Sequence, residues 1–201
     1  MKIAVIGATG TIGAALVDLL QKQAYDVIPV SRKSDPGVDI AHPASIEAFF
    51  KKIGPIDGLI SVAGDVAFGP LAEIDDDQLR FSIDSKLLGQ INLVRKGLDN
   101  LRPNGVAILT GGMLFYRPTP GTYTAVMLNA AVEGFVKGAA KDLTQNRRIL
   151  VVHPPLVRET AIKMGMQPGS SPDAATLAQT YLKALQSDLT GEVIFAEGHE
   201  D

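Results

Sequence analysis

A glycine-rich turn near the N-terminus constrains the fold of this chain more than any other feature. The turn, Gly7-Ala8-Thr9-Gly10-Thr11-Ile12-Gly13, separates a short β-branched run at residues 3–6 from leucines at helical spacing over residues 12–22. The apolar run predicts a strand buried on both faces, as in a parallel sheet. Glycines permit a tight turn and a close approach of backbone N–H groups to a phosphate, and the helix start adds partial positive charge. The context predicts a strand–turn–helix unit that binds a pyrophosphate, and it disfavours a plain connecting turn.

The rest of the chain repeats this alternation of strands and helices. Further strands are predicted at residues 27–30, 38–40, 56–62, 106–110, 149–152 and 193–196. Helices are predicted at residues 12–22, 43–53, 75–100 (one long helix, or a short one followed by a long one), 124–143 and 172–186, and a loop at residues 158–171. This alternation predicts the α/β class, with a three-layer Rossmann fold: a doubly wound parallel sheet with helices on both faces. The length fits a single dinucleotide-binding domain that spans residues 1–201.

The composition argues against several classes of protein. With 46% hydrophobic and 20% charged residues, the chain is not expected to be disordered. A net charge of −3 disfavours a nucleic-acid partner. The absence of cysteine excludes disulfides and thiol catalysis, and it favours a cytoplasmic location. His42, His153 and His199 are far apart in the sequence and lack the spacing of metal ligands. No apolar run suits a signal peptide or approaches the roughly 20 residues that span a bilayer, so no membrane association is expected.

Basic residues follow the second predicted strand, where Rossmann folds bind the adenosine ribose. An acidic residue at this place binds the ribose 2′-hydroxyl of NAD and repels a 2′-phosphate. This chain has Ser31-Arg32-Lys33-Ser34 there, and two cations with two hydroxyls suit a phosphate. The pattern favours NADP over NAD as the cofactor, and a solvated basic turn is the alternative. Asp39 and Ile40 are predicted to border the adenine, although a simple turn aspartate would give the same sequence.

These features and several later motifs resemble the short-chain dehydrogenase/reductase family over nearly the whole chain. Where that family has Asn-Asn-Ala-Gly and Ser-Pro-Gly-x-Val, this chain has Ser61-Val62-Ala63-Gly64 and His153-Pro154-Pro155-Leu156-Val157. Pro120-Gly121 and residues 130–135 and 189–194 match as well, but the glycine spacing is closer to the extended and atypical branches, and the chain is shorter than usual. The motifs and the resemblance together predict these cofactor-binding residues: Gly7, Thr9, Gly10, Thr11, Ile12, Gly13, Ser31, Arg32, Lys33, Asp39, Ile40, Ala63, Gly64, Asn129, Pro154 and Val157.

The family's catalytic group is not found in its usual form. The resemblance implies Asn, Ser, Tyr and Lys, with the last two spaced as Y-x-x-x-K. That spacing does not occur, because the residues four positions after the four tyrosines are Pro29, Pro120, Met127 and Leu185.

An ungapped match on Pro120-Gly121 and residues 130–135 shows which residues take those positions. It places Ala125 at the tyrosine, Asn129 at the lysine and Gly112 at the serine position, and a match on Gly89 places Lys86 at the asparagine position. A frame shifted by two residues would instead place Tyr123, Thr110 and Met127 at the tyrosine, serine and lysine positions. Methionine can neither bind a ribose hydroxyl nor stabilise a phenolate, so the standard mechanism fails in either frame.

Three residues are candidates for a substitute catalytic group. Lys86 is predicted to reach the nicotinamide ribose, or to lower the pKa of a phenol, from the neighbouring helix. The alternative is that it pairs with an acid such as Asp84 or points to solvent. Tyr123, or else Tyr116, would supply a hydroxyl, and Asn129 can still hydrogen-bond a ribose hydroxyl.

Two functions follow from these patterns. The first is an NADP-dependent oxidoreductase of unknown substrate with a non-standard active site, since orientation of the nicotinamide alone retains some activity. The second is a catalytically inactive NADP(H)-binding sensor or scaffold. A homodimer or homotetramer is expected through the two long helices, although their small residues would equally suit packing on the sheet. The loop at residues 158–171 is expected to cover the cleft, with Met164 and Met166 in a hydrophobic lid, and no metal is expected.

Overall fold

The chain forms one parallel sheet between two layers of helices. The computed structural model describes residues 1–196, so His199 lies outside the described residues. The strands are β1 (Lys2–Ile6), β2 (Asp26–Val30), β3 (Ile56–Ser61), β4 (Leu101–Thr110), β5 (Arg148–His153) and β6 (Val193–Phe195). Their order across the sheet is β2-β1-β3-β4-β5-β6, and every neighbouring pair is parallel. The predicted α/β fold with a doubly wound sheet is confirmed.

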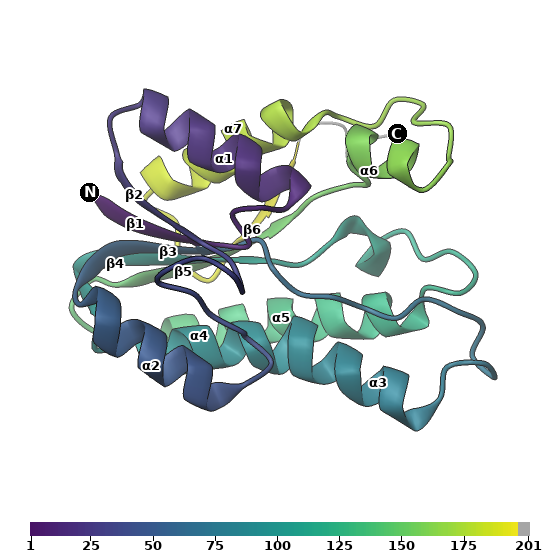
Figure 1. Ribbon diagram of the computed structural model, residues 1–201, viewed down its shortest axis with the longest axis horizontal. Coiled ribbons are helices and arrows are strands. Elements are labelled where there is room, and N and C mark those ends of the chain that lie inside the picture. The colour runs from purple at the N-terminus through teal and green to yellow at the C-terminus, as the bar shows by residue number, and fades with distance from the viewer. Residues whose placement is uncertain (197–201) are drawn as a thin grey trace.

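The helices lie on both faces of this sheet (Figure 1). One layer contains α1 (Thr11–Lys22) and α7 (Ala174–Gln186), with the short α6 (Arg158–Lys163) beyond the strand ends. The other layer contains α2 (Pro43–Ile53), α3 (Asp76–Ser82), α4 (Gly89–Gly97) and α5 (Tyr123–Asp142). A π-helical segment, η1 (Ile83–Leu88), joins α3 to α4, and a short 3-10 helix, η2 (Met113–Phe115), follows β4.

The apolar runs become central strands because both faces of the sheet are covered. In β1, Ile3 and Val5 pack with α1 and α7, whereas Ala4 and Ile6 pack with α2. All four side chains are at most 1% exposed. Alternate residues of one strand therefore belong to two different cores, which explains why the run reads as continuously hydrophobic.

Several predicted elements were wrong, among them the strand predicted from residue 106, since β4 begins at Leu101; for three others the structure shows why. Residues 38–40 form no strand: the Val38 N–H donates to the Ser31 carbonyl oxygen and the Asp39 N–H to the Ser45 Oγ. The predicted loop at residues 158–171 begins with the helix α6. The helix predicted from residue 172 begins at Ala174, because the Asp173 carboxylate caps it by accepting from the Thr176 N–H.

The long helical stretch at residues 75–100 is one continuous helical path with an irregular middle. Asp75 and Gln78 close a capping box at its start, which satisfies two backbone donors reciprocally. The path then runs through α3, the π-helical η1 and α4 without a break. Such π segments occur often at functional sites.

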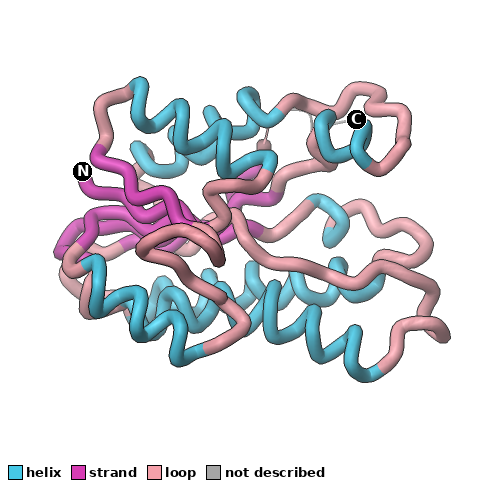
Figure 2. The backbone as a smooth tube through the Cα atoms, in the orientation of Figure 1, coloured by secondary structure: helices cyan, strands magenta, loops and turns pink. Residues whose placement is uncertain are grey.

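Loops gather beyond the carboxyl ends of the strands (Figure 2).

Within residues 1–196, no helix is both long and apolar enough to cross a membrane. The same residues hold no group of three or more His, Cys, Asp or Glu side chains that could bind a metal ion.

Gly97 in α4 lies where α4 packs closely against α2. A Cβ at Gly97 would lie 2.2 Å from Cζ of the buried Phe50 on α2. We expect Gly97→Ala to lower the free energy of unfolding by about 1–3 kcal/mol, because overpacking outweighs the better helix propensity of alanine.

The control is Gln21→Ala, at an exposed position of α1. We expect this variant to be as stable as the wild type, or slightly more stable. Urea unfolding of the three proteins measures the difference, and equal loss in both variants would contradict the close packing of α2 on α4.

Candidate functional site

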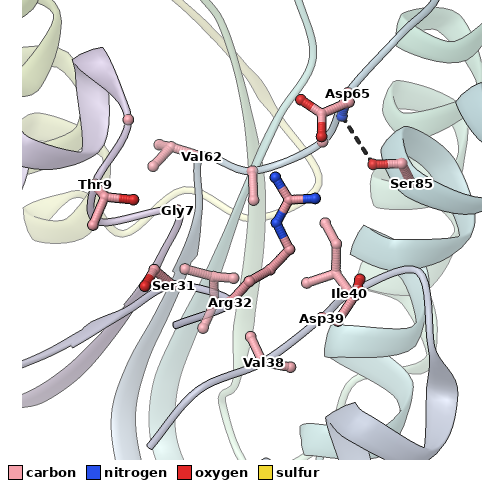
Figure 3. Close-up of a pocket in the computed structure, with 14 residues that line it drawn as sticks. Gly7, Thr9, Ser31, Arg32, Val38, Asp39, Ile40, Val62, Asp65 and Ser85 are labelled. Atoms are coloured by element: carbon pink, nitrogen blue, oxygen red, sulfur yellow. Dashed lines mark hydrogen bonds between the residues drawn. The ribbon is translucent and has the colours of Figure 1, made fainter. Parts of the chain in front are cut away.

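A pocket opens at the carboxyl ends of β1, β2 and β3 (Figure 3). After β1 the chain turns to β2 on one side, whereas β3 lies on the other side, so β1 is a switch point of the sheet. Ligands of open α/β sheets bind in the crevice at such a point. The pocket is lined by Ile6, Gly7, Thr9, Gly10, Ser31, Arg32, Val38, Asp39, Ile40, Val62, Ala63, Gly64, Asp65 and Ser85.

The glycine turn forms one wall of the pocket. The N–H groups of Gly7 and Ala8 both donate to the Val30 carbonyl oxygen, at 2.9 and 3.0 Å, which holds the turn against β2. Gly7 has a φ of 91°, and a Cβ at Gly13 would lie 2.0 Å from the Gly7 oxygen, so α1 packs on the turn only with glycine there. No side chain caps α1, and its first turn holds no acidic residue. Its first N–H groups are therefore free to bind an anion.

The second wall is the turn after β2, which places the predicted ribose-binding residues. The Ser31 Oγ accepts from the N–H groups of Lys33 and Ser34, and the Ser34 Oγ accepts from the Ser31 N–H at 2.8 Å. These bonds fold the turn tightly and project the Arg32 side chain across the pocket (Figure 3). Lys33 is exposed and does not line the pocket.

Residues 38–40 form the third wall, although they are not a strand. A Cβ at Gly89 of α4 would lie 2.9 Å from Cγ1 of Ile40, so the Ile40 side chain packs against this helix. The backbone of residues 38–40 does not join the sheet. Asp39 lines the pocket, while its Oδ1 accepts from the Ala41 N–H at 3.1 Å and its Oδ2 lies 3.1 Å from His42 Nδ1. Asp39 therefore both stabilises the turn and lines the pocket.

The other predicted cofactor residues do not line the pocket. Thr11 begins α1, Ile12 packs against the core, and Gly13 supports the turn. Pro154 accepts from the Met113 N–H, and the buried Val157 precedes α6. Sequence reasoning missed Asp65 and Ser85, whose contact (Asp65 N–H to Ser85 Oγ, 2.9 Å) closes the far end of the pocket. No local pattern marks Ser85, because it reaches the pocket from the π-helical segment.

That π-helical segment also directs Lys86 into the interior. The Gln90 Nε2 donates to the Lys86 carbonyl oxygen at 3.0 Å and to the Thr110 oxygen at 2.9 Å, and the Gln90 Oε1 accepts from the Thr110 N–H. The Gln90 amide thus ties the helix to the end of β4.

The Lys86 Nζ donates to the Gly111 carbonyl oxygen at 3.1 Å. The alternative of a solvent-exposed Lys86, or one paired with Asp84, was wrong, since its side chain is buried.

The ammonium of Lys86 lies close to the pocket and is easily deprotonated. A Cβ at Gly64, which lines the pocket, would lie 2.9 Å from Cδ of Lys86. Burial lowers the pKa of Lys86 to about 8, and the nearby Asp65 carboxylate opposes this shift. Lys86 can therefore both hold and release a proton close to neutral pH.

The side chains of Asn129 and His153 pack against Gly111 and Gly112, the two glycines that follow β4. The Asn129 Nδ2 donates to the Gly112 oxygen at 3.2 Å, and the Gly112 N–H donates to His153 Nδ1 at 3.0 Å. A Cβ at Gly111 would lie 2.4 Å from His153 Cε1, and one at Gly112 would lie 2.7 Å from Asn129 Nδ2. Larger residues, serine included, do not fit at either glycine without displacing these side chains.

The two tyrosines proposed as hydroxyl donors are placed elsewhere. Tyr123 begins α5 and lines a separate apolar hollow with Leu71, Val126 and Met127. The Tyr116 hydroxyl donates to Glu133 at 2.5 Å, and burial together with this carboxylate raises the pKa of Tyr116 to about 12. Of the three candidate residues, the structure brings Lys86 and Asn129 to the same glycine pair and leaves Tyr123 outside.

Comparison with known proteins agrees with this fold. The family model described as enoyl-(acyl carrier protein) reductase matches residues 17–187. The crystal structure of lin1944 from Listeria innocua is 36% identical, with a TM-score of 0.92 over 97% of this chain and 98% of that chain. A small-chain dehydrogenase solved in complex with NADPH is 29% identical, with a TM-score of 0.91 over 99% of this chain and 97% of that chain.

The chain belongs to the short-chain dehydrogenase/reductase family. Among characterised sequences, the oxidoreductase UcpA of Escherichia coli K12 is 27% identical over 158 residues. That match covers 73% of this chain but only 59% of UcpA.

Proposed function

We propose that this protein is an NADP(H)-dependent oxidoreductase with a non-standard active site. The observation that carries the proposal is the Arg32 side chain, which projects into the pocket that also holds the glycine turn. No carboxylate occupies the tip of β2 beside it, where NAD-binding members place one. The NADPH-bound relative supports the same cofactor.

The residues of the pocket fit each part of this cofactor. The open N–H groups at the start of α1 suit the pyrophosphate, and the Arg32 guanidinium, with the hydroxyls of Ser31 and Ser34 near it, suits the 2′-phosphate. Asp39 and Ile40 suit the adenine. When bound, the nicotinamide supplies the hydride chemistry, which the protein orients.

Lys86 and Asn129 are the proposed groups of the reactive end. The Lys86 ammonium has three N–H donors, of which one is used by the Gly111 oxygen, so others remain for a ribose hydroxyl or a substrate carbonyl. A pKa near 8 lets it give up a proton at working pH. The Asn129 side-chain amide donates to the neighbouring Gly112 carbonyl oxygen and so fixes its direction.

A second function is an NADP(H)-binding sensor or scaffold without turnover. It is favoured by the buried Ala125, which stands at the family's tyrosine position and has no group that transfers a proton. In this case the pocket would bind the dinucleotide and report its level through a partner protein.

A homodimer is the proposed assembly, with a tetramer as its larger form. Leu88 in η1 and Met127 on α5 are exposed, and the space above Gly134 and Gly138 is open, so a second copy could approach α5 closely. On the opposite side of the site, α6 and the residues after it expose Ile162, Met164 and Met166, and we propose that they form the apolar lid over the substrate.

Replacing Arg32 tests the choice of cofactor. We expect Arg32→Ala to weaken NADPH binding about 10- to 150-fold, because a charged hydrogen bond contributes about 1.5–3 kcal/mol. NADH binding is expected to change less than about twofold. Calorimetric titration measures both, and Arg102→Ala, which removes a surface ion pair with Asp57, is the control. Equal losses for the two cofactors would contradict the assignment.

Replacing Lys86 tests the oxidoreductase itself. Wild-type protein is mixed with NADPH and a panel of aldehydes, ketones and quinones, and the loss of NADPH absorbance is followed. We expect Lys86→Met to lower kcat by about 10²-fold or more and to weaken NADPH binding by a smaller factor, because at most one hydrogen bond to the ribose is lost. Lys22→Met, at an exposed ion pair on α1, is the control. NADPH binding without turnover on any substrate would favour the sensor, and no binding would refute both functions.

Light scattering tests the assembly. We expect the wild type at micromolar concentration to have at least twice the 21.3 kDa mass of one chain. Met127→Glu should shift it to the monomer, because a buried carboxylate without a partner is costly. Met166→Glu, in the proposed lid, should leave the mass unchanged. A monomeric wild type would refute the dimer.

A further inference from the structure

A cluster of ionisable side chains lies behind the Gly111–Gly112 turn, apart from the residues that line the dinucleotide pocket. His153, at the end of β5, is fully buried. Its Nε2 lies 3.4 Å from Oε2 of the buried Glu133 on α5. Glu133 also accepts hydrogen bonds from the Tyr116 hydroxyl and from the Lys137 ammonium. The Tyr116 ring packs edge-on against the imidazole, with ring centroids 5.5 Å apart.

The charge of Glu133 favours one tautomer of His153 over the other. Burial tends to raise the pKa of Glu133, but the hydrogen bonds from Lys137 and Tyr116 outweigh it and hold that pKa below its usual range. Glu133 is therefore a carboxylate, and its charge favours a proton on the facing Nε2, although the 3.4 Å separation makes no hydrogen bond there. Nδ1 is then an acceptor, and it accepts from the Gly112 N–H at 3.0 Å.

Protonation of His153 would conflict with this arrangement. The imidazolium has N–H groups at both nitrogens, so Nδ1 would face the Gly112 N–H as a second donor. Within residues 1–196, the acceptor that Nδ1 can reach is the Gly112 oxygen, also at 3.0 Å. The protonated ring would therefore lose the bond from the Gly112 N–H and share the Gly112 oxygen with Asn129.

The turn that His153 holds is the same one that binds Lys86 and Asn129. Gly111 accepts from Lys86, and Gly112 accepts from Asn129. Any shift of this turn therefore moves both groups of the reactive end. The ring also occupies the space that a Cβ at Gly111 would need, which ties the presence of histidine to that of glycine.

We propose that His153 and Glu133 are positioning residues: Glu133 favours the tautomer of His153 whose Nδ1 carries no proton, and His153 holds the Gly111–Gly112 turn in the form that Lys86 and Asn129 need for turnover. The catalytic part of this inference rests on the proposed oxidoreductase function, whereas the tautomer and its effect on Gly112 do not.

The charges around His153 favour its neutral form at neutral pH. Burial lowers the pKa of His153, and Lys86 and Lys137 add to this shift. The Gly112 carbonyl oxygen, which can accept from a protonated Nδ1, and the Glu133 carboxylate oppose it, and Tyr116 contacts the ring as a neutral phenol. Because the folded pKa is lowered, the neutral ring persists until the pH falls below the ordinary histidine value of about 6.5. The turn is expected to loosen only in that acidic range.

Nitrogen NMR of labelled histidine tests the tautomer without any substrate. At about pH 7.5 we expect His153 to show the Nε2–H form, with its signal assigned by its loss in His153→Asn. Glu133→Gln should raise the share of the Nδ1–H form, because the negative charge facing Nε2 is gone. The Gly112 amide resonance should shift with pH in the wild type and not in His153→Asn. An Nδ1–H ring or an imidazolium in the wild type at this pH would overturn the proposal.

Turnover of NADPH with whichever carbonyl the wild type reduces tests the positioning role. In His153→Asn, the amide oxygen can accept from the Gly112 N–H but does not titrate. We expect this variant to keep kcat within about threefold and to lose the acidic step of the kcat–pH profile. His153→Leu lacks the acceptor, and its kcat should fall about tenfold or more at an NADPH Kd within twofold of the wild type.

The two variants separate positioning from mere stability. A wild-type acidic step in His153→Asn, or an unchanged kcat in His153→Leu, would overturn the proposal. If His153→Leu does not fold, Glu133→Gln takes its place, with a moved acidic step as the expected result and an unmoved step as the contrary one. If the wild type reduces no substrate, the oxidoreductase function fails, while the NMR result still decides the state of His153.

Discussion

The side-chain amide of Gln90 is the contact on which the site depends. It satisfies three backbone groups at once, the Lys86 oxygen and both the N–H and the oxygen of Thr110, inside a protein interior where an unpaired polar group costs about 1–3 kcal/mol. One side chain thus joins the π-helical segment of one layer to the end of a central strand. Ser85 and Lys86 reach the pocket and the glycine pair only because the helix is held in this irregular form.

The two ends of the pocket differ in character. The adenosine end is built in the usual way for a Rossmann fold, from a glycine turn, a helix start and a polar turn after the second strand. The proposed reactive end is built around two adjacent glycines whose missing side chains leave room for His153 and Asn129. His153 therefore depends on the missing side chain of Gly111, and Asn129 depends on that of Gly112.

Sequence patterns predicted the strands and helices well where hydrophobic periodicity was strong. They failed at residues 38–40, because Ile40 packs on Gly89 of a helix and the N–H groups of Val38 and Asp39 bond to Ser31 and Ser45. They also failed for the surroundings of Lys86: most lysines are exposed, and no local pattern shows that a backbone oxygen 25 positions away lies within reach. The pairing of Tyr116 with Glu133 instead of with Lys86 is likewise a matter of how loops and helices meet in space.

The sequence alone shows which reactive and binding groups each segment carries. The glycine turn, the cations after the second strand and the lack of Y-x-x-x-K are all local facts, and they led to the fold, to the favoured cofactor and to the question of catalysis. Only the tertiary structure decided which of the remaining polar groups meet. It placed Lys86 and Asn129 on one glycine pair, put Tyr123 outside, and set Glu133 against His153. The reason is physical: burial, hydrogen-bond geometry and charge neighbours arise between residues far apart in the chain, so no single segment encodes them.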